Sequence, residues 1–273
     1  MRNTKPSLFQ KERKCSLYVP SIIRFVCKNI LVGLSFALLF HGAAVADSLP
    51  GITARSWLVA DQAGNILHGE NVNEVRSIAS ITKLMTVMIV LDSEQPLDEK
   101  IPIKLHNKNL TRKELIDLAI VKSDNEAARL LCQYYVSGYK NCIKAMNEKA
   151  QNLQMHDTVF TDPTGRLSDN RSTAVDLIKL VLAASNYPLI VEASNKDTIR
   201  INNNKKVIEF HNTNTLVGRG YHFIVTKTGF INQAGGCIVL MMETENGIRT
   251  VILLGSKNTK TRIPEAKILS AMN

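Results

Sequence analysis

The hydrophobic pattern predicts strands near both ends of residues 47–273 and helices in between. Five short apolar-rich runs are typical of strands: 55–60, 66–69, 223–228, 237–243 and 249–255. Polar residues at 61–65 and the sequence Glu245-Asn246-Gly247 indicate tight turns, so the first two and the last two runs each predict a hairpin. The residues after Thr261 predict a short closing helix.

Helical patterning fills the middle of the chain. Ser80 to Leu91 is apolar on nearly every side, which predicts a helix buried at the centre of a domain. Thr111 and Glu114 have the spacing of a capping box that opens a helix through Val121. Further helices are expected at 125–135, 139–153 and 173–184, with a loop at 160–171. Strands, helices and strands in this order predict an α+β fold, an antiparallel sheet with a helical subdomain.

The N-terminal segment has the organisation of an export signal. Residues 1–46 contain seven Lys and Arg residues against one acidic residue, then a short apolar run at 30–40 and the small residues Ala44-Val45-Ala46. This pattern predicts a signal peptide (1–46), cleaved after Ala46, and an exported domain (47–273) in the periplasm. An uncleaved anchor, with peripheral association at the inner membrane, or a start codon assigned too far upstream remain alternatives; the anchor also exports the domain.

The net charge of +10 is concentrated in that segment, and the rest of the chain carries only +4. So mild a balance predicts no nucleic-acid partner. The six histidines are scattered without ligand spacing, and no C-x-x-C pair occurs, so neither a metal nor a cofactor is expected.

Three cysteines remain in the exported part of the chain, where the environment is oxidising. Cys132 and Cys142 flank a predicted interhelical turn at Ser137-Gly138 and are candidates for one disulfide bond. The alternative is that these two cysteines and Cys237 are all small buried hydrophobic residues.

Ser80 and Lys83 form an S-x-x-K motif at the start of the predicted buried helix. They are one helical turn apart, so the amine can reach the hydroxyl and act as its base. Burial, the helix N-terminus and a second cation such as Lys227 would each lower the pKa of Lys83 toward neutrality. Taken alone, the motif is also compatible with Ser80 as a helix cap and Lys83 as a side chain that reaches the surface.

Ser123-Asp124-Asn125 forms an S-x-N motif between two predicted helices. There, Ser123 can relay a proton and Asn125 can hold a substrate amide. Taken alone, this motif is also compatible with Asn125 as a helix N-cap.

Lys227-Thr228-Gly229 forms a K-T-G motif at the end of a predicted strand, where an extended peptide can pair with the sheet edge. Lys227 and Thr228 are expected to bind a substrate carboxylate, and Gly229 lets the backbones approach closely. The backbone N–H groups of Ser80 and Phe230 are expected to form an oxyanion hole. The three motifs in this order predict an active-site serine acyltransferase, although K-T-G alone is compatible with a solvated strand end.

These motifs resemble those of the low-molecular-weight penicillin-binding proteins, the serine D-alanyl-D-alanine peptidases, and most closely the endopeptidases among them. The likeness covers most of residues 55–255 and includes further blocks: Arg76 to Thr86, Asp162 to Gly165, Ser172 to Ala174, His211 to Asn214, and Thr226 to Phe230 with Ala234-Gly235. It implies a β-lactamase/transpeptidase-like fold, peptidoglycan peptides as substrates and β-lactams as covalent inhibitors. Two departures leave the substrate preference open: a shorter segment at 103–111, and Arg166 where an apolar residue is usual.

The resemblance therefore implies a DD-endopeptidase that cleaves D-Ala cross-links, with a D-Ala-D-Ala carboxypeptidase as the alternative. A β-lactamase needs a base that activates the deacylating water, and the 160–171 loop offers Asp162 and Asp169 but no glutamate. A non-catalytic peptidoglycan-binding module would not need a nucleophile at Ser80. We also expect no room after the last strand for the second, β-rich domain of larger carboxypeptidases.

Overall fold

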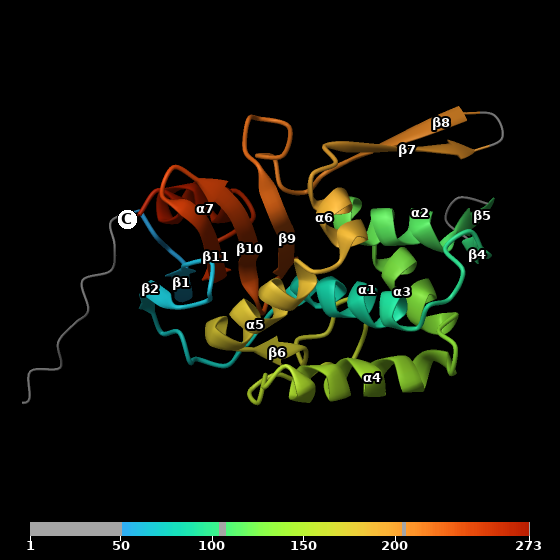
Figure 1. Ribbon diagram of the computed structural model, residues 1–273, viewed down its shortest axis with the longest axis horizontal. Coiled ribbons are helices and arrows are strands. Elements are labelled where there is room, and N and C mark those ends of the chain that lie inside the picture. The colour runs from blue at the N-terminus through green and yellow to red at the C-terminus, as the bar shows by residue number, and fades with distance from the viewer. Residues whose placement is uncertain (1–50, 104–107, 204–205, 273) are drawn as a thin grey trace, which may run out of the picture. The chain divides into compact units, whose positions relative to one another are not determined.

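An antiparallel sheet collects both ends of the described chain (Figure 1). The computed structural model describes residues 51–103, 108–203 and 206–272. The strand order is β2-β1-β11-β10-β9, and the bounds are β1 (Ser56–Ala60), β2 (Ile66–Glu70), β9 (Phe223–Ile231), β10 (Gly235–Thr244) and β11 (Gly247–Ser256). The predicted strands, both hairpins and the α+β class are confirmed. Strand β9 forms one edge of the sheet, so its outer side is available to pair with an extended peptide.

Helices fill the middle of the chain as predicted. Their bounds are α1 (Thr82–Asp92), α2 (Arg112–Asp117), α3 (Asn125–Gln133), α4 (Gly138–Asn152), α5 (Ala174–Ala184), α6 (Pro188–Ser194) and α7 (Arg262–Ser270). A 3-10 turn, η1 (Ala79–Ile81), precedes α1, and a π turn, η3 (Leu118–Lys122), follows α2. The capping box at Thr111 and Glu114 is present, but the α-helix it opens ends at Asp117 rather than Val121 because the chain widens into the π turn.

Three small two-stranded ladders complete the fold. They pair β3 (Arg76–Ser77) with β6 (Arg171–Ser172), β4 (Lys100–Ile103) with β5 (Lys108–Thr111), and β7 (Thr198–Asn203) with β8 (Lys206–His211). The β3–β6 ladder is the one that matters for the site, because it joins the residues just before η1 to the end of the 160–171 loop.

Helix α1 is buried because it is apolar on nearly every side. It contacts α3, α4 and α5, and residues 82–90 are all buried. Helix α5 covers one face of the sheet together with this helical subdomain, while α7 covers the other face with Ala266 and Leu269. The central helix therefore carries its N-terminal end to the sheet, which places η1 against β9.

Two predictions made from the sequence need correction. No element is predicted for residues 188–222, yet they hold α6 and the β7–β8 hairpin. Pro188 occupies the first turn of α6, where its fixed φ and missing N–H are tolerated, but seven residues are too few to show helical periodicity. The prediction that Lys227-Thr228-Gly229 ends a strand is wrong, since β9 continues to Ile231 in register with β10.

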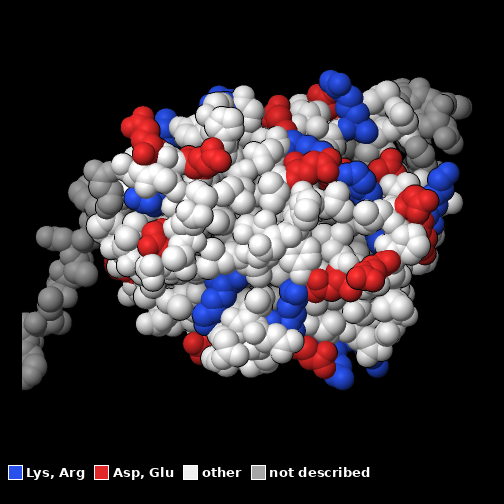
Figure 2. Space-filling model, viewed as in Figure 1, with Lys and Arg blue, Asp and Glu red and all other residues white. Residues whose placement is uncertain are grey.

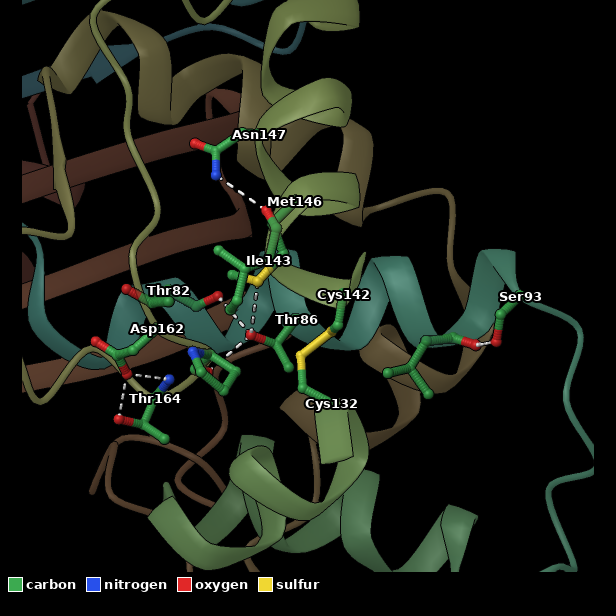
Figure 3. Close-up of a disulfide and its surroundings, with 12 residues drawn as sticks. Thr82, Thr86, Ser93, Cys132, Cys142, Ile143, Met146, Asn147, Asp162 and Thr164 are labelled. Carbon is green, nitrogen blue, oxygen red and sulfur yellow. Dashed lines mark hydrogen bonds between the residues drawn. A yellow bond between two sulfur atoms is a disulfide. The ribbon is translucent and has the colours of Figure 1, made fainter. Parts of the chain in front are cut away.

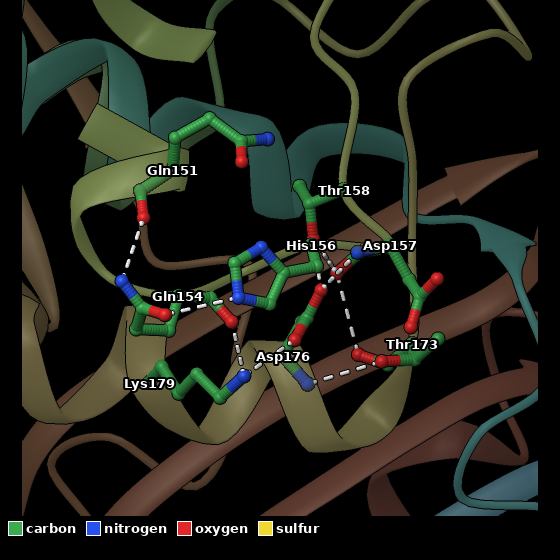
Figure 4. A network of polar contacts seen from close by, with 9 residues as sticks. Gln151, Gln154, His156, Asp157, Thr158, Thr173, Asp176 and Lys179 are labelled. Atoms are coloured by element: carbon green, nitrogen blue, oxygen red, sulfur yellow. Dashed lines mark hydrogen bonds and ion pairs between the residues drawn. The ribbon is translucent and has the colours of Figure 1, made fainter. Parts of the chain in front are cut away.

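A polar network ties α5 to the turn that follows α4 (Figure 4). Asp176 accepts hydrogen bonds from the Thr158 hydroxyl at 2.9 Å and the Asp157 backbone N–H at 2.9 Å, and Lys179 pairs with the same carboxylate at 2.9 Å. Thr173 caps α5 by accepting from the backbone N–H of Asp176. Both ends of the 160–171 loop are thus anchored, which restricts the loop that faces Ser80.

A disulfide bond joins Cys132 on α3 to Cys142 on α4, with the two Cα atoms 5.4 Å apart (Figure 3). The prediction of a disulfide between Cys132 and Cys142 is therefore confirmed, and Cys237 is free and buried. On the face drawn in Figure 2, basic and acidic side chains are scattered over a largely uncharged surface.

The predicted signal peptide (1–46) lies outside the described residues, so it stays a prediction. Within the described ranges, no single helix is long and apolar enough to cross a membrane; α5 and α6 reach that length only together, with a bend of 107° between them.

Candidate active site

Ser80 lies in the 3-10 turn η1, between the N-terminal end of α1 and strand β9. The preceding residue, Ala79, has a φ of 46°, a left-handed conformation that is uncommon for a residue with a side chain. The Thr82 hydroxyl donates to the Ala79 carbonyl at 2.8 Å and helps to hold this turn. Such strain is often found at functional sites. Ser80 is not a helix cap, since α1 has Ile81 at its N-cap position and no side-chain capping bond.

Lys83 meets Ser80 directly. Its Nζ donates to Ser80 Oγ at 2.8 Å, to Asn125 Oδ1 at 2.8 Å and to the Thr164 carbonyl at 2.6 Å. The side chain is completely buried, so the interpretation of Lys83 as a chain that reaches the surface is wrong. Three acceptors orient the amine toward the serine hydroxyl.

Burial lowers the pKa of Lys83 from its ordinary value of 10.5 to about 7. The carboxylates of Asp162 and Asp124 oppose this shift, and the guanidinium of Arg166 adds to it. A lysine with this pKa is neutral in a large fraction of molecules at neutral pH and can accept a proton from Ser80.

Asn125 joins this cluster because another residue takes the capping role. Asp124 is the N-cap of α3 and accepts the Ala127 backbone N–H at 2.8 Å, which leaves the Asn125 amide free to bind Lys83. Ser123 follows the π turn with a φ of 60° and is half-buried. The hydrogen bonds of the cluster connect Ser80, Lys83 and Asn125, and none of them involves the Ser123 hydroxyl.

Lys227 lies in the middle of β9 and is buried, with Nζ donating to the Thr228 carbonyl at 3.0 Å. Burial lowers its pKa well below the ordinary value, and the charges of Lys83 and Arg262 lower it further. The cation that lowers the pKa of Lys83 is Arg166, so the predicted role of Lys227 as that second cation is not borne out.

The remaining residues of the K-T-G motif fix the edge of β9 beside Ser80. A Cβ atom on Gly229 would lie 2.8 Å from the Ser80 backbone nitrogen, so this position requires glycine. Thr228 donates from Oγ1 to Thr213 Oγ1 at 2.7 Å, and Arg262 donates to the Gly229 carbonyl at 2.7 Å. Phe230 follows with 41% of its surface exposed, at the position predicted to line an oxyanion hole together with Ser80.

The 160–171 loop supports Lys83 through the Thr164 carbonyl. Asp162 Oδ1 accepts the backbone N–H groups of Thr164 at 2.7 Å and Gly165 at 2.9 Å. This turn presents the Thr164 carbonyl to Lys83, and Gly165 lies so close to Ala79 that no side chain would fit. Asn170 donates to the Asp162 carbonyl at 2.9 Å and closes the loop.

Motif reasoning therefore assembled the central residues but missed Thr164, Thr213 and Arg262. Thr164 and Thr213 belong to blocks that carried the family resemblance, and that was the only sequence signal for them. Arg262 had no signal, because its contact with Gly229 joins the closing helix to a distant strand. Among the described residues, no group of three or more His, Cys, Asp or Glu side chains is arranged to hold a metal ion.

Sequence comparison matches the chain to the Peptidase_S11 model, described as D-alanyl-D-alanine carboxypeptidase, over residues 43–108 and 97–258. The chain is 38% identical to the D-alanyl-D-alanine endopeptidase of Escherichia coli over 245 residues, which are 83% of this chain and 79% of that protein. It is 36% identical to the D-alanyl-D-alanine endopeptidase of Pseudomonas aeruginosa over 233 residues, or 79% and 75% of the two chains.

Solved structures with the same fold include penicillin-binding protein D2 of Listeria monocytogenes in its ampicillin-bound form. It matches with a TM-score of 0.72 and 26% identity over 80% of this chain and 96% of that chain. The Streptomyces K15 DD-transpeptidase matches with a TM-score of 0.71 and 25% identity, also over 80% and 96%. The expected β-lactamase/transpeptidase-like fold is thereby confirmed.

Proposed function

Because the chain belongs to the Peptidase_S11 family of serine D-alanyl-D-alanine peptidases, we propose that it is a DD-endopeptidase that cleaves D-Ala cross-links in peptidoglycan. The observation that carries the chemistry is the 2.8 Å contact between Nζ of the buried Lys83 and Oγ of the half-buried Ser80. The choice of endopeptidase rests on similarity to two proteins that bear that name.

Acylation begins when neutral Lys83 takes the proton of Ser80 and Ser80 Oγ attacks the carbonyl carbon of the D-Ala residue. The negative charge that develops on the carbonyl oxygen is stabilised by the backbone N–H groups of Ser80 and Phe230. The proton then passes to the leaving amine, with Ser123 as the relay, and the C–N bond breaks. Water attacks the resulting ester, gives a proton to the same base and releases the acid product, which restores Ser80.

The substrate lies along the outer edge of β9. Asn125 holds an amide of the peptide that donates the acyl group, and Lys227 with the Thr228 hydroxyl binds a carboxylate on the leaving side. The negative charge of that carboxylate favours the protonated form of Lys227, against the effect of burial on its pKa. Gly229 allows the substrate backbone to approach the turn that carries Ser80. Supporting this placement, β9 is an edge strand and Gly229 packs against the Ser80 nitrogen.

A carboxypeptidase that removes terminal D-Ala is the second candidate, since the matched family bears that description. The positions of the two acidic residues in the 160–171 loop disfavour fast β-lactam hydrolysis. Asp162 is held by the turn through its own backbone contacts, and Asp169 faces solvent beside Arg171. Neither is placed to activate a deacylating water, so we expect long-lived β-lactam adducts on Ser80.

Export to the periplasm is part of the proposal, because the substrate is found outside the cytoplasm. It is supported by the N-terminal pattern of basic, apolar and small residues, and by the Cys132–Cys142 disulfide, which persists in an oxidising compartment.

Digestion of purified muropeptides tests the function. Cross-linked dimers should fall to monomers, and Ser80→Ala should abolish this while remaining folded. Dimers that stay intact while monomeric pentapeptides lose D-Ala would identify a carboxypeptidase instead. Penicillin labelling that survives Ser80→Ala would refute the nucleophile.

A further inference from the structure

A basic hollow lies at the end of the sheet where β9 turns into β10. It has a volume of about 410 Å³ and is lined by the turn at 232–235, by the end of β11 and by residues just before β1. Three cationic residues line it: Arg55, Arg76 and Lys257. The catalytic scheme uses none of them.

Arg76 forms the inner wall of this hollow and is only partly neutralised. Its Nη1 pairs with Glu74, but its Nε is buried and has no hydrogen-bond partner among the described residues. The guanidinium lies flat against Gly255, where a Cβ atom would come within 3.1 Å of Nη2. The guanidinium has five N–H donors, and those that face the hollow beside the Glu74 pair can donate to an anion.

Arg55 and Lys257 are exposed at the rim. The buried carboxylate of Glu265 is bound to two residues that line the hollow, because Oε1 accepts from the Thr53 hydroxyl at 2.6 Å and Oε2 from the Ser256 hydroxyl at 2.7 Å. Arg76 is paired with Glu74, and Glu265 is held by two hydroxyl groups below the hollow. The charges of Arg55 and Lys257 therefore leave an excess of positive charge facing the cavity. Such a cavity favours an anion.

A second hollow of about 290 Å³ adjoins the first. It shares Arg76, Gln233 and Ala234 with the first, and Val75, Ser77, Ser168 and Arg171 line the rest of it. Ser77 lies three residues before Ser80 on β3, and Ser168 belongs to the loop that supports Lys83. The two hollows therefore share a wall at the β9–β10 turn, and residues that are close in sequence to the active site line the second one.

The direction of the bound substrate follows from the proposed function. With the leaving-side carboxylate at Thr228 and the reacting carbonyl beside Phe230, the peptide upstream of the scissile bond continues past Ile231 toward the turn. From Phe230 to Gln233 is three residues, or at most about 10 Å of chain. Three residues of an extended peptide cover the same span.

We propose that this hollow is an anion subsite for the acyl-donor peptide, in which Arg55, Arg76 and Lys257 bind a carboxylate about three residues upstream of the scissile bond. The inference rests on the proposed function for the direction of the substrate. Peptides with a carboxylate at this position are therefore the preferred acyl donors.

Two matched cross-linked peptides test the subsite: one carries a carboxylate three residues upstream of the scissile bond, and the other carries a carboxamide there. The unsubstituted enzyme should prefer the carboxylate peptide by about tenfold in kcat/KM, a typical effect of charge pairing at a partly exposed site. The double variant Arg55→Gln/Lys257→Gln should lose most of that preference. Neither side chain is part of the core, so the variant should fold.

Arg219→Gln is the matched control, since Arg219 is exposed in the loop before β9, at the opposite end of that strand. It removes one exposed positive charge outside the hollow and should leave the preference unchanged. Equal kcat/KM values for the two peptides in the unsubstituted enzyme, or a preference that survives the double variant, would overturn the subsite.

Competition separates this inference from the proposed function. Both peptides are also measured as competitors of fluorescent penicillin labelling, which needs no peptide cleavage. If neither cross-link is cut but the carboxylate peptide competes better and loses this advantage in the double variant, the subsite stands and the endopeptidase activity fails. If cross-links are cut but the two peptides compete equally, the subsite fails and the activity stands.

Discussion

Gly229 lies directly against the backbone nitrogen of Ser80, so close that a Cβ atom on Gly229 would come within 2.8 Å of it. The contact joins the edge of the sheet to the turn that carries the nucleophile. It also holds the two proposed oxyanion donors, the N–H groups of Ser80 and Phe230, near each other, because Phe230 directly follows Gly229.

Gly229→Ala should therefore impair acylation without unfolding the protein. The added methyl group pushes the Ser80 N–H away from the reacting carbonyl, and loss of one such donor costs about 100-fold in rate. Penicillin acylation rates measure the effect, and thermal unfolding serves as the control for folding. An alanine variant that acylates at the normal rate would contradict this role of the contact.

Lys83→Met should fold but acylate about 100- to 10,000-fold more slowly, because Ser80 loses its general base while the core keeps its volume. In the unsubstituted enzyme, acylation should rise with pH through about 7, since only neutral Lys83 accepts the proton. A rate profile across this pH range tests both statements. A folded Lys83→Met variant with an unchanged pH profile would exclude Lys83 as the base.

Arg166→Leu should move the rising limb of the acylation profile to higher pH. The guanidinium disfavours protonation of Lys83, so its removal raises the pKa of the base. Arg219→Leu removes an exposed charge elsewhere and should leave the midpoint where it is. A shift to lower pH, or an equal shift in the control, would mean that Arg166 does not act on Lys83 through its charge.

Asp162→Ala should lower both stability and acylation. The carboxylate accepts the buried backbone N–H groups of Thr164 and Gly165, and leaving such donors unsatisfied costs about 3 kcal/mol. The turn also presents the Thr164 carbonyl to Lys83, so the amine loses an orienting contact. Asp169→Ala, on the exposed part of the same loop, is the control and should change neither denaturant unfolding nor acylation.

Replacing both Cys132 and Cys142 with serine should lower the free energy of unfolding by about 3 kcal/mol, through release of a short loop in the unfolded chain. Denaturant titration measures the loss. Because neither cysteine contacts the Ser80–Lys83–Asn125 cluster, the folded variant should acylate at nearly the normal rate. A large fall in acylation with unchanged stability would show that the bond acts on the site rather than on the fold.

The sequence by itself determined the features that depend on neighbours along the chain. The spacing of Ser80 and Lys83 brings the amine to the hydroxyl, although Ser80 lies in the 3-10 turn before α1. The Thr111–Glu114 capping box and the hairpin turn at 245–247 are equally local. The apolar character of 81–91 predicted a buried helix, and this was confirmed. Motif order then identified the candidate residues from three separate parts of the chain.

Tertiary structure decided how those parts meet. Asp124 rather than Asn125 caps α3, which frees Asn125 for Lys83, and the backbone carbonyl of Thr164, 81 residues away in sequence, completes the cluster. The K-T-G motif lies inside β9 rather than at its end, because pairing with β10 extends the strand. The lowered pKa of Lys83 also belongs to this level. It arises from burial by elements distant in sequence, and desolvation depends on how the whole domain packs around the amine.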